Sequence, residues 1–181
     1  MKSSNRLISS FILNFSLCNK FDFPNVFALP SLDKVILNSF ISDLDNPVSS
    51  YYPRSLSMVE TLTAQKVIIK NVKKTLKGKK AYQVVVSHNV VLRKEFLYNF
   101  LVFFLYFGTR GLEEKFQKYN YHLNDNGSYY FRIKDVTALP GLAEEFFKWP
   151  YMLDCFFVSK KINDYLLSKF FFRYLGFPFI Y

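Results

Sequence analysis

The residues of this chain that most clearly suggest a chemistry are basic side chains gathered in one short window. Between Thr61 and Lys94 there are nine lysines and arginines and no acid, and they carry nine of the ten net positive charges of the chain. A solvated basic face usually interleaves acids, and this window has none. Charge this local predicts contact with a polyanion, and RNA is the leading hypothesis. The nine residues are Lys66, Lys70, Lys73, Lys74, Lys77, Lys79, Lys80, Arg93 and Lys94.

Metal and disulfide chemistry have little support in the sequence. His88 and His122 are single histidines without the short spacing that zinc sites use. Cys18 and Cys155 are the two cysteines, far apart and without metal-like neighbours. We therefore expect no metal site and no disulfide framework, and a reducing compartment fits this cysteine usage.

Catalytic chemistry is also weakly supported. Glu113–Glu114 and Glu144–Glu145 are adjacent pairs, and neighbouring helical residues point about 100° apart, so neither pair need share a site. The glycines of Gly108–Gly111 are too sparse for a phosphate-binding loop. We expect no catalytic residue and no cofactor, and hence a protein that is not an enzyme.

The length and composition predict one folded domain. The chain has 181 residues, of which 50% are hydrophobic and 20% aromatic, which is enough for a buried core and unlike a disordered basic tail. Its longest apolar stretch is the twelve residues Phe96–Phe107, shorter than the roughly 20 residues of a membrane span. We expect an N-terminal arm over residues 1–28, a single domain over 29–181, and no membrane span.

The amino-acid usage bears on the compartment. Phe and Tyr, with 22 and 13 copies, far outnumber the six glycines, as expected of a gene under strong A/T pressure. The first 21 residues hold no acid and several serines, like a transit peptide. We favour an organelle-encoded protein over an imported one. The predicted location is the mitochondrial matrix, with a plastid or a bacterium as the alternative.

The pattern of apolar residues and turn signals predicts an α+β fold, an antiparallel sheet with helices packed on one face and an N-terminal helical arm. The expected strands are Leu32–Asn38, Val67–Ile69, Val84–Leu92, Tyr129–Lys134 and Tyr151–Val158. One expected helix ends with Leu56–Thr63. Two more are expected over Lys94–Phe107 and Asn163–Tyr174. The expected loops are Asp43–Pro53, Lys70–Tyr82 around Gly78, and Tyr119–Ser128 with a turn at Asn126-Gly127.

Several short motifs resemble one known family in the order in which that family has them. Leu29–Asn38 reads Leu-Pro-Ser-Leu-Asp-Lys-Val-Ile-Leu-Asn and resembles the Val-Pro-x-Leu-Glu-Lys-Ile-Val-Leu-Asn of large-subunit ribosomal protein five. Asn126–Asp135 is similar to the family's Arg-Gly-Asn-Tyr-Ser-Phe-Gly-Ile-Lys-Glu, and Leu175–Phe179 repeats its ending. Further matches are Phe21–Val26, Thr63–Lys66, Val90–Arg93 and Arg110–Leu112. Each match alone is weak, but together they run in order over nearly the whole chain.

The resemblance implies a structural protein of the central protuberance of the large ribosomal subunit. Its implied partners are 5S rRNA if present, large-subunit rRNA, P-site tRNA, and neighbouring ribosomal proteins, including one that forms a bridge to the small subunit. The implied rRNA-binding residues are Lys34, Asn38, Gln65, Lys66, Lys70 and Arg93. The implied tRNA-contacting loop, Lys73–Tyr82, carries Lys73, Lys74, Lys77, Lys79 and Lys80.

The chain also departs from the family pattern. Val91 stands where the family has a strand threonine that helps to bind 5S rRNA, and valine offers no hydroxyl. The aromatic residue of the family's tRNA loop is replaced within Leu76–Lys80. From the residues alone, Asn38 and Gln65 could equally be amides that cap turns. The alternative function is a free RNA-binding module or a basic protein of a membrane surface.

Overall fold

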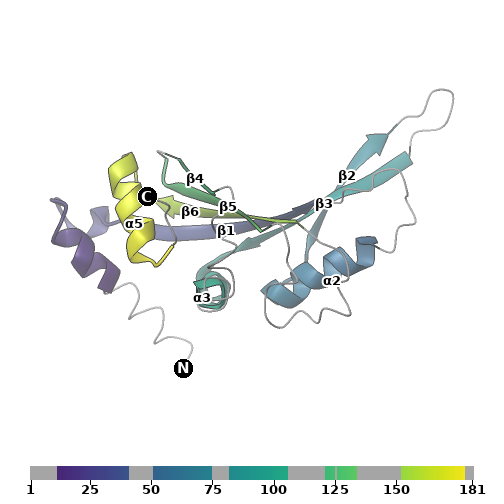
Figure 1. Cartoon of the computed structure of the whole chain (residues 1–181), viewed down its shortest axis with the longest axis horizontal. Helices are drawn as coiled ribbons and strands as arrows, with labels where there is room; N and C mark the ends of the chain where they lie inside the picture. Colours follow the sequence, from purple (N-terminus) through teal and green to yellow (C-terminus); the bar gives the residue numbers. More distant parts are fainter. Residues whose placement is uncertain are drawn as a thin grey trace.

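The computed structural model describes residues 12–40, 51–74, 82–105, 121–124, 126–133 and 152–177. Its described strands form one six-stranded sheet in the order β2-β3-β1-β6-β5-β4 (Figure 1), and every pairing is antiparallel. The strands are β1 (Ser31–Phe40), β2 (Ile68–Lys74), β3 (Tyr82–Leu92), β4 (Tyr121–Asn124), β5 (Ser128–Ile133) and β6 (Leu153–Lys160). The helices are a short one over residues 12–18, η1 (Val26–Ala28), α2 (Tyr51–Thr63), α3 (Lys94–Phe103) and α5 (Tyr165–Tyr174).

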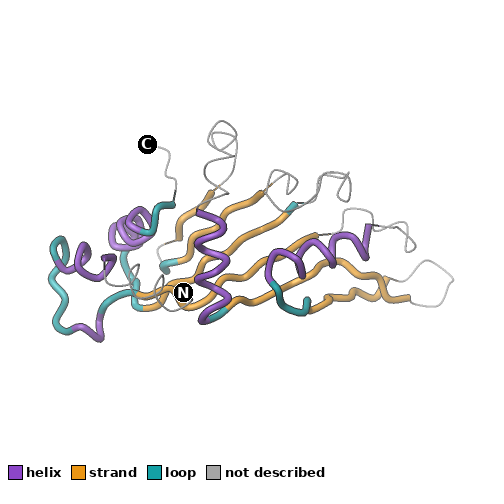
Figure 2. The backbone as a smooth tube through the Cα atoms, turned by 90° about the horizontal axis from the view of Figure 1, so that it is seen from below, coloured by secondary structure: helices purple, strands orange, loops and turns teal. Residues whose placement is uncertain are grey.

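Alternation along the strands directs one set of side chains into the core. In β1, Val35 and Leu37 are fully buried, and the register sets them opposite buried residues of both neighbouring strands. Because successive strand residues point to opposite faces, each strand contributes alternate positions to one core. Helices α2 and α3 cover that face (Figure 2). The predicted α+β fold is confirmed.

A buried polar contact joins helix α2 to the sheet. Ser55, Met58 and Val59 lie on its buried side at helical spacing. The Ser55 Oγ lies 2.8 Å from His88 Nε2 of β3, and burial lowers the pKa of His88 despite an opposing effect of Glu60. His88 is thus a core histidine under α2.

The aromatic residues of the C-terminal region pack into the core. Phe171 and Phe172 of α5 are buried, and Phe172 contacts the rings of Tyr129 and Phe177 at centroid distances of 5.2 and 5.3 Å. Gly176 has φ +90°, which lets the Phe177 N–H donate to the Phe172 carbonyl and end the helix. The unusual aromatic content therefore builds the core itself.

The described part of the predicted N-terminal arm also reaches the core. Leu13 and Leu17, in the helix of residues 12–18, belong to the main buried cluster. Phe21 contacts Phe170 of α5, with ring centroids 5.5 Å apart. The division of the chain at residue 28 stays a prediction.

The structure differs from the sequence-based prediction at three segments. Tyr51–Pro53 begins helix α2 instead of ending a loop, which is allowed because proline is tolerated in the first helical turn. Tyr121–Asn124 is a strand paired with β5, not a loop. Lys70–Lys74 continues strand β2, because pairing with β3 overrides the weak strand preference of its lysines. Within the described residues, no helix has the length and apolar character needed to cross a membrane.

Candidate nucleic-acid interface

The second face of the sheet is the candidate interface. Lys34, Ile36 and Asn38 of β1 alternate with the buried residues of that strand and so point away from the core. Among the described elements, no helix packs against this side: α2 and α3 lie on the other (Figure 2), and the buried residues of the helix 12–18 and of α5 belong to the core cluster. We call it the open face.

The three strands β2, β3 and β1 form what we call the basic half of the open face. The register pairs Ile36 with Val91 and Asn38 with Asn89, and directly paired residues of antiparallel strands point to the same side. Lys34 and Asn38 are half-buried, and Lys70 of β2 is exposed. The structure thus brings the predicted residues Lys34 and Asn38 onto one surface with Val91.

Asn89 belongs to this surface and was missed by the sequence interpretation. It lies beside Asn38, and its Oδ1 is buried without a hydrogen-bond donor among the described residues. The signal that could have identified it is the alternation of the predicted strand Val84–Leu92, which gives Asn89 and Val91 the same face. What was lacking was the pairing register with β1.

The strands β6, β5 and β4 form the other half, which we call the aromatic half. Asp154 is 5% exposed and accepts two hydrogen bonds from Arg132, Nε to Oδ1 at 2.7 Å and Nη2 to Oδ2 at 3.0 Å. The Tyr130 hydroxyl donates to Asp154 Oδ1 at 3.1 Å, and the ring of Tyr130 lies 4.8 Å from that of Phe156. Arg132 and Asp154 are therefore paired with each other within this half.

The electrostatics of the cluster follow from these contacts. Hydrogen bonding to Asp154 raises the pKa of Arg132, so the guanidinium stays charged. Burial, and then the charge of Asp154, raise the pKa of Tyr130, so its phenol stays protonated. At neutral pH the aromatic half thus presents aromatic rings beside an ion pair in which Arg132 and Asp154 neutralise each other.

The remaining predicted rRNA-binding residues lie at one end of the β2–β3 pair. Gln65 is half-buried and Lys66 exposed in the connection from α2 to β2. Arg93 is exposed at the start of α3, directly after β3. Because Ile68 pairs with Asn89 in antiparallel register, the start of β2 and the end of β3 lie together. These three residues therefore border the basic half.

Part of the predicted tRNA-contacting loop belongs to a strand. Lys73 and Lys74 lie in strand β2, opposite Gln83 and Tyr82 of β3, so the prediction that they belong to a loop is wrong. The other three lysines of the set, Lys77, Lys79 and Lys80, lie outside the described residues. Lys73 and Lys74 stand at the far end of the hairpin because the antiparallel pairing continues to them.

The described residues offer little for metal or covalent chemistry. Among them, no group of three His, Cys, Asp or Glu side chains is placed to hold a metal ion. His88 is in the core, and His122 is exposed on β4. Cys18 is an exposed free thiol and Cys155 a buried one, and burial raises the pKa of Cys155, so it stays protonated.

Comparison with known proteins agrees with the motif resemblance. No family model matches the chain. It is 27% identical over 174 residues to the large ribosomal subunit protein uL5c of Cyanidium caldarium, covering 92% of each chain. It is 26% identical over 172 residues to the large ribosomal subunit protein uL5 of Malacoplasma penetrans strain HF-2, covering 91% of this chain and 88% of the relative. The chain is thus similar over nearly its whole length to a plastid and a bacterial ribosomal protein, whose names support a structural role in the ribosome and not a catalytic one.

Proposed function

We propose that this protein is a structural constituent of the large ribosomal subunit and binds rRNA through the basic half of its open face. The observation that carries the proposal is the position of Lys34, Asn38 and Asn89 on one face that no described helix covers. The similarity to two proteins named uL5 supports the ribosomal setting.

The chemistry of the basic half suits a folded RNA. Lysine ammonium groups attract phosphates and position the protein, without reading sequence. The amide of Asn38 can donate to and accept from ribose 2′-hydroxyls and base edges, whereas Asn89, whose Oδ1 is buried, can contribute only its amide N–H groups. Val91 cannot hydrogen-bond, so the contact depends on the lysines and amides around it.

The P-site tRNA is proposed as a second RNA partner, through the lysines at and beyond the tip of β2. The β2–β3 pair extends past α2, at the opposite end of the molecule from the N-terminal helix (Figure 1). Lys73 and Lys74 are at that end, which supports a reach toward a ligand outside the main body. A contact with the small subunit is proposed on the family resemblance alone.

The cellular compartment is also a proposal. The two relatives come from a plastid and a bacterium, which supports a ribosome of one of these types. The mitochondrial location rests on the aromatic-rich, glycine-poor composition. Identifying the RNAs that co-purify with the tagged protein would distinguish a plastid, a bacterial and a mitochondrial ribosome, because each has its own rRNA.

Sedimentation tests the ribosomal role itself. The tagged full chain is expressed in its own cells, and the lysate is run on a sucrose gradient in high salt, which removes proteins held only by weak electrostatic contacts. We expect the protein to co-migrate with the large subunit. A protein that stays at the top of the gradient, or that pellets with membranes in low salt, would contradict the proposal.

A further inference from the structure

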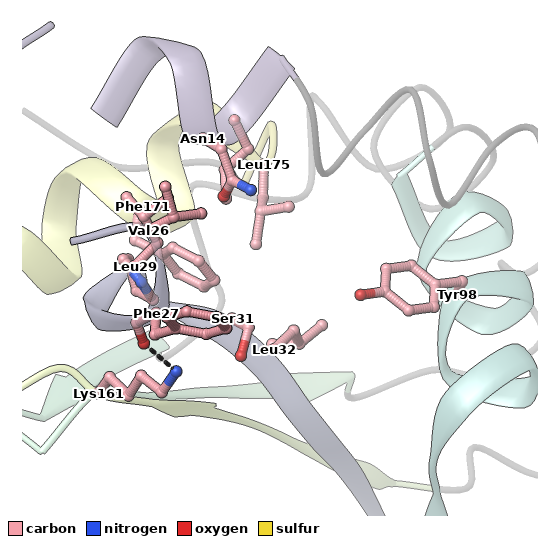
Figure 3. Close-up of a pocket in the computed structure, with 12 residues that line it drawn as sticks. Asn14, Val26, Phe27, Leu29, Ser31, Leu32, Tyr98, Lys161, Phe171 and Leu175 are labelled. Atoms are coloured by element: carbon pink, nitrogen blue, oxygen red, sulfur yellow. Dashed lines mark hydrogen bonds between the residues drawn. The ribbon is translucent and has the colours of Figure 1, made fainter. Parts of the chain in front are cut away.

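A small pocket lies outside the open face, where the N-terminal segment meets the rest of the fold. It has a volume of about 250 Å³ and is lined by residues of the helix 12–18, η1, the start of β1, α3 and α5 (Figure 3). Pockets for drug-sized ligands start at about 300 Å³. This one therefore suits a single small, flat group more than a helix or a long peptide.

The mouth of the pocket carries an unusually exposed aromatic ring. Phe27 is 84% exposed although it lies in an ordered turn. The Asn25 Oδ1 accepts a hydrogen bond from the Ala28 N–H at 2.8 Å, and the Lys161 ammonium donates to the Phe27 carbonyl (Figure 3). These contacts hold the turn in place while its ring points to solvent. Because burying an apolar ring is favourable, a flat partner that covered the exposed ring of Phe27 would gain binding free energy.

The lining combines apolar walls with hydrogen-bonding groups on several sides. Phe171, Leu175 and Leu32 supply apolar surface, while Asn14, Ser31 and Tyr98 supply polar atoms. In Figure 3 the hydroxyl end of Tyr98 faces across the cavity, and the Asn14 amide lies on the far side of it. A flat heteroaromatic group with donors and acceptors on its edge matches this arrangement, because its faces are apolar and its edge is polar.

We propose that this pocket receives one nucleobase of a bound RNA, turned out of its stack, with the ring of Phe27 against it at the mouth. The Lys161 ammonium, which donates to the Phe27 carbonyl, supplies a cation for the adjoining phosphate. The pocket also adjoins the proposed rRNA interface, since Ser31 and Leu32 of its lining begin strand β1, which carries Lys34 and Asn38. A protein partner fits less well, because a 250 Å³ recess with polar groups around it is small for a docking segment.

This inference rests on the proposed RNA-binding function and is tested with RNA probes. The affinity of the full chain is measured for short single-stranded adenylate, uridylate and cytidylate RNAs, and for a chain of the same length without bases. Phe27→Ala removes the ring, and Phe27→Tyr keeps one. Phe15→Ala is the matched control, because Phe15 is an exposed phenylalanine of the N-terminal helix outside the pocket lining.

We expect the wild type to bind at least one base-containing RNA more tightly than the abasic chain. Phe27→Ala should reduce the affinity ratio between base-containing and abasic RNA by about five-fold to 100-fold, the range of base–aromatic stacking. Phe27→Tyr should keep it, and Phe15→Ala should not change it. Asn14→Leu should weaken binding to some bases more than to others, because it removes an amide and keeps the size of the side chain.

The outcomes separate this inference from the proposed function. If the wild type binds all four RNAs equally, or if Phe27→Ala and Phe15→Ala behave alike, the nucleobase pocket is wrong while RNA binding stands, and a protein segment becomes the better occupant. If the wild type binds none of the probes and no rRNA at low salt, the RNA-binding function itself is wrong.

Discussion

The two halves of the open face differ in what they do with their charges. In the aromatic half, Arg132 donates two hydrogen bonds to the carboxylate of the nearly buried Asp154. The rings of Tyr130 and Phe156 lie beside this pair. In the basic half, no described acidic side chain forms an ion pair with Lys34 or Lys70. A charge already paired within the protein has little attraction left for a polyanion, whereas an unpaired lysine keeps it. The same sheet therefore presents one surface that stabilises itself and one that is available to RNA.

The largest expected effect concerns the turn that supports the aromatic half. Gly127 has φ +70°, and a Cβ there would clash with Ser159 Oγ and lie 2.8 Å from the Ile162 Cβ. Gly127→Ala should lower the free energy of unfolding by about 2–5 kcal/mol, from left-handed strain and overpacking together. Chemical denaturation would measure this.

Gly176→Ala is the matched control for that prediction. Gly176 also has positive φ, but a Cβ there meets nothing closer than 3.9 Å. Only the backbone strain of about 1–2 kcal/mol should remain. Equal losses in the two variants would mean that the contact of Gly127 with β6 is unimportant.

The next effect concerns the ion pair of the aromatic half. Asp154→Asn removes the charge that holds Arg132 and Tyr130, and should lower the free energy of unfolding by about 1–2 kcal/mol, since Arg132 is 40% exposed and partly solvated. It should also raise affinity for rRNA several-fold at low salt, because the Arg132 charge is no longer neutralised.

Asp33→Asn provides the comparison for Asp154. The Asp33–Lys160 pair is more exposed, with side chains 23% and 59% accessible, so its loss should change stability by less than about 1 kcal/mol. A lower rRNA affinity in Asp154→Asn, with the fold intact, would show that the aromatic half binds RNA through its intact cluster. That result would remove the distinction between the two halves.

The basic half should show the opposite behaviour. Lys34→Ala and Lys70→Ala should leave thermal stability nearly unchanged, because these side chains are not core residues. Each should weaken rRNA binding. Each should also reduce the slope of log affinity against log salt concentration by about one, the value for one lost phosphate contact. Lys169→Ala, on α5, is the control and should change neither quantity.

The smallest expected effect concerns Val91. Val91→Thr adds a hydroxyl beside Ile36 and near Asn38 on the open face. One new hydrogen bond is worth about 1 kcal/mol, so affinity for a bacterial-type 5S rRNA should rise several-fold, as measured by fluorescence anisotropy. No change in affinity, with unchanged stability, would indicate that strand β3 does not meet this RNA.

Much of the sheet was predictable, because most of its strands are rich in β-branched, aromatic or alternating apolar residues. The run of β-forming residues in Leu32–Asn38 indicated a strand, and the alternation of Tyr129–Lys134 indicated both a strand and its buried face. Tyr121–Asn124 was missed, since a strand of only four residues depends on its pairing with β5. The length of β2 was missed for the same reason, because its lysines are weak strand formers held by β3.

The candidate site was only partly predictable. Lys34 and Asn38 were identified through the family motif, but the residue beside them, Asn89, depends on the register between β1 and β3. The Arg132–Asp154 pair joins residues 22 positions apart in the sequence. The pocket beside Phe27 depends on packing among four separate segments. Such long-range juxtapositions leave no local pattern in a single sequence.

Lysine footprinting in the assembled particle tests the central claim most directly. Lysines are acylated in the free protein and in the large subunit, and the modified positions are compared by mass spectrometry. We predict that Lys34, Lys66 and Lys70 are strongly protected in the subunit, since RNA covers the basic half. Protection of Lys160, on the opposite half of the sheet, should be weaker. Equal reactivity of Lys34 and Lys70 in the free and assembled protein would contradict the account.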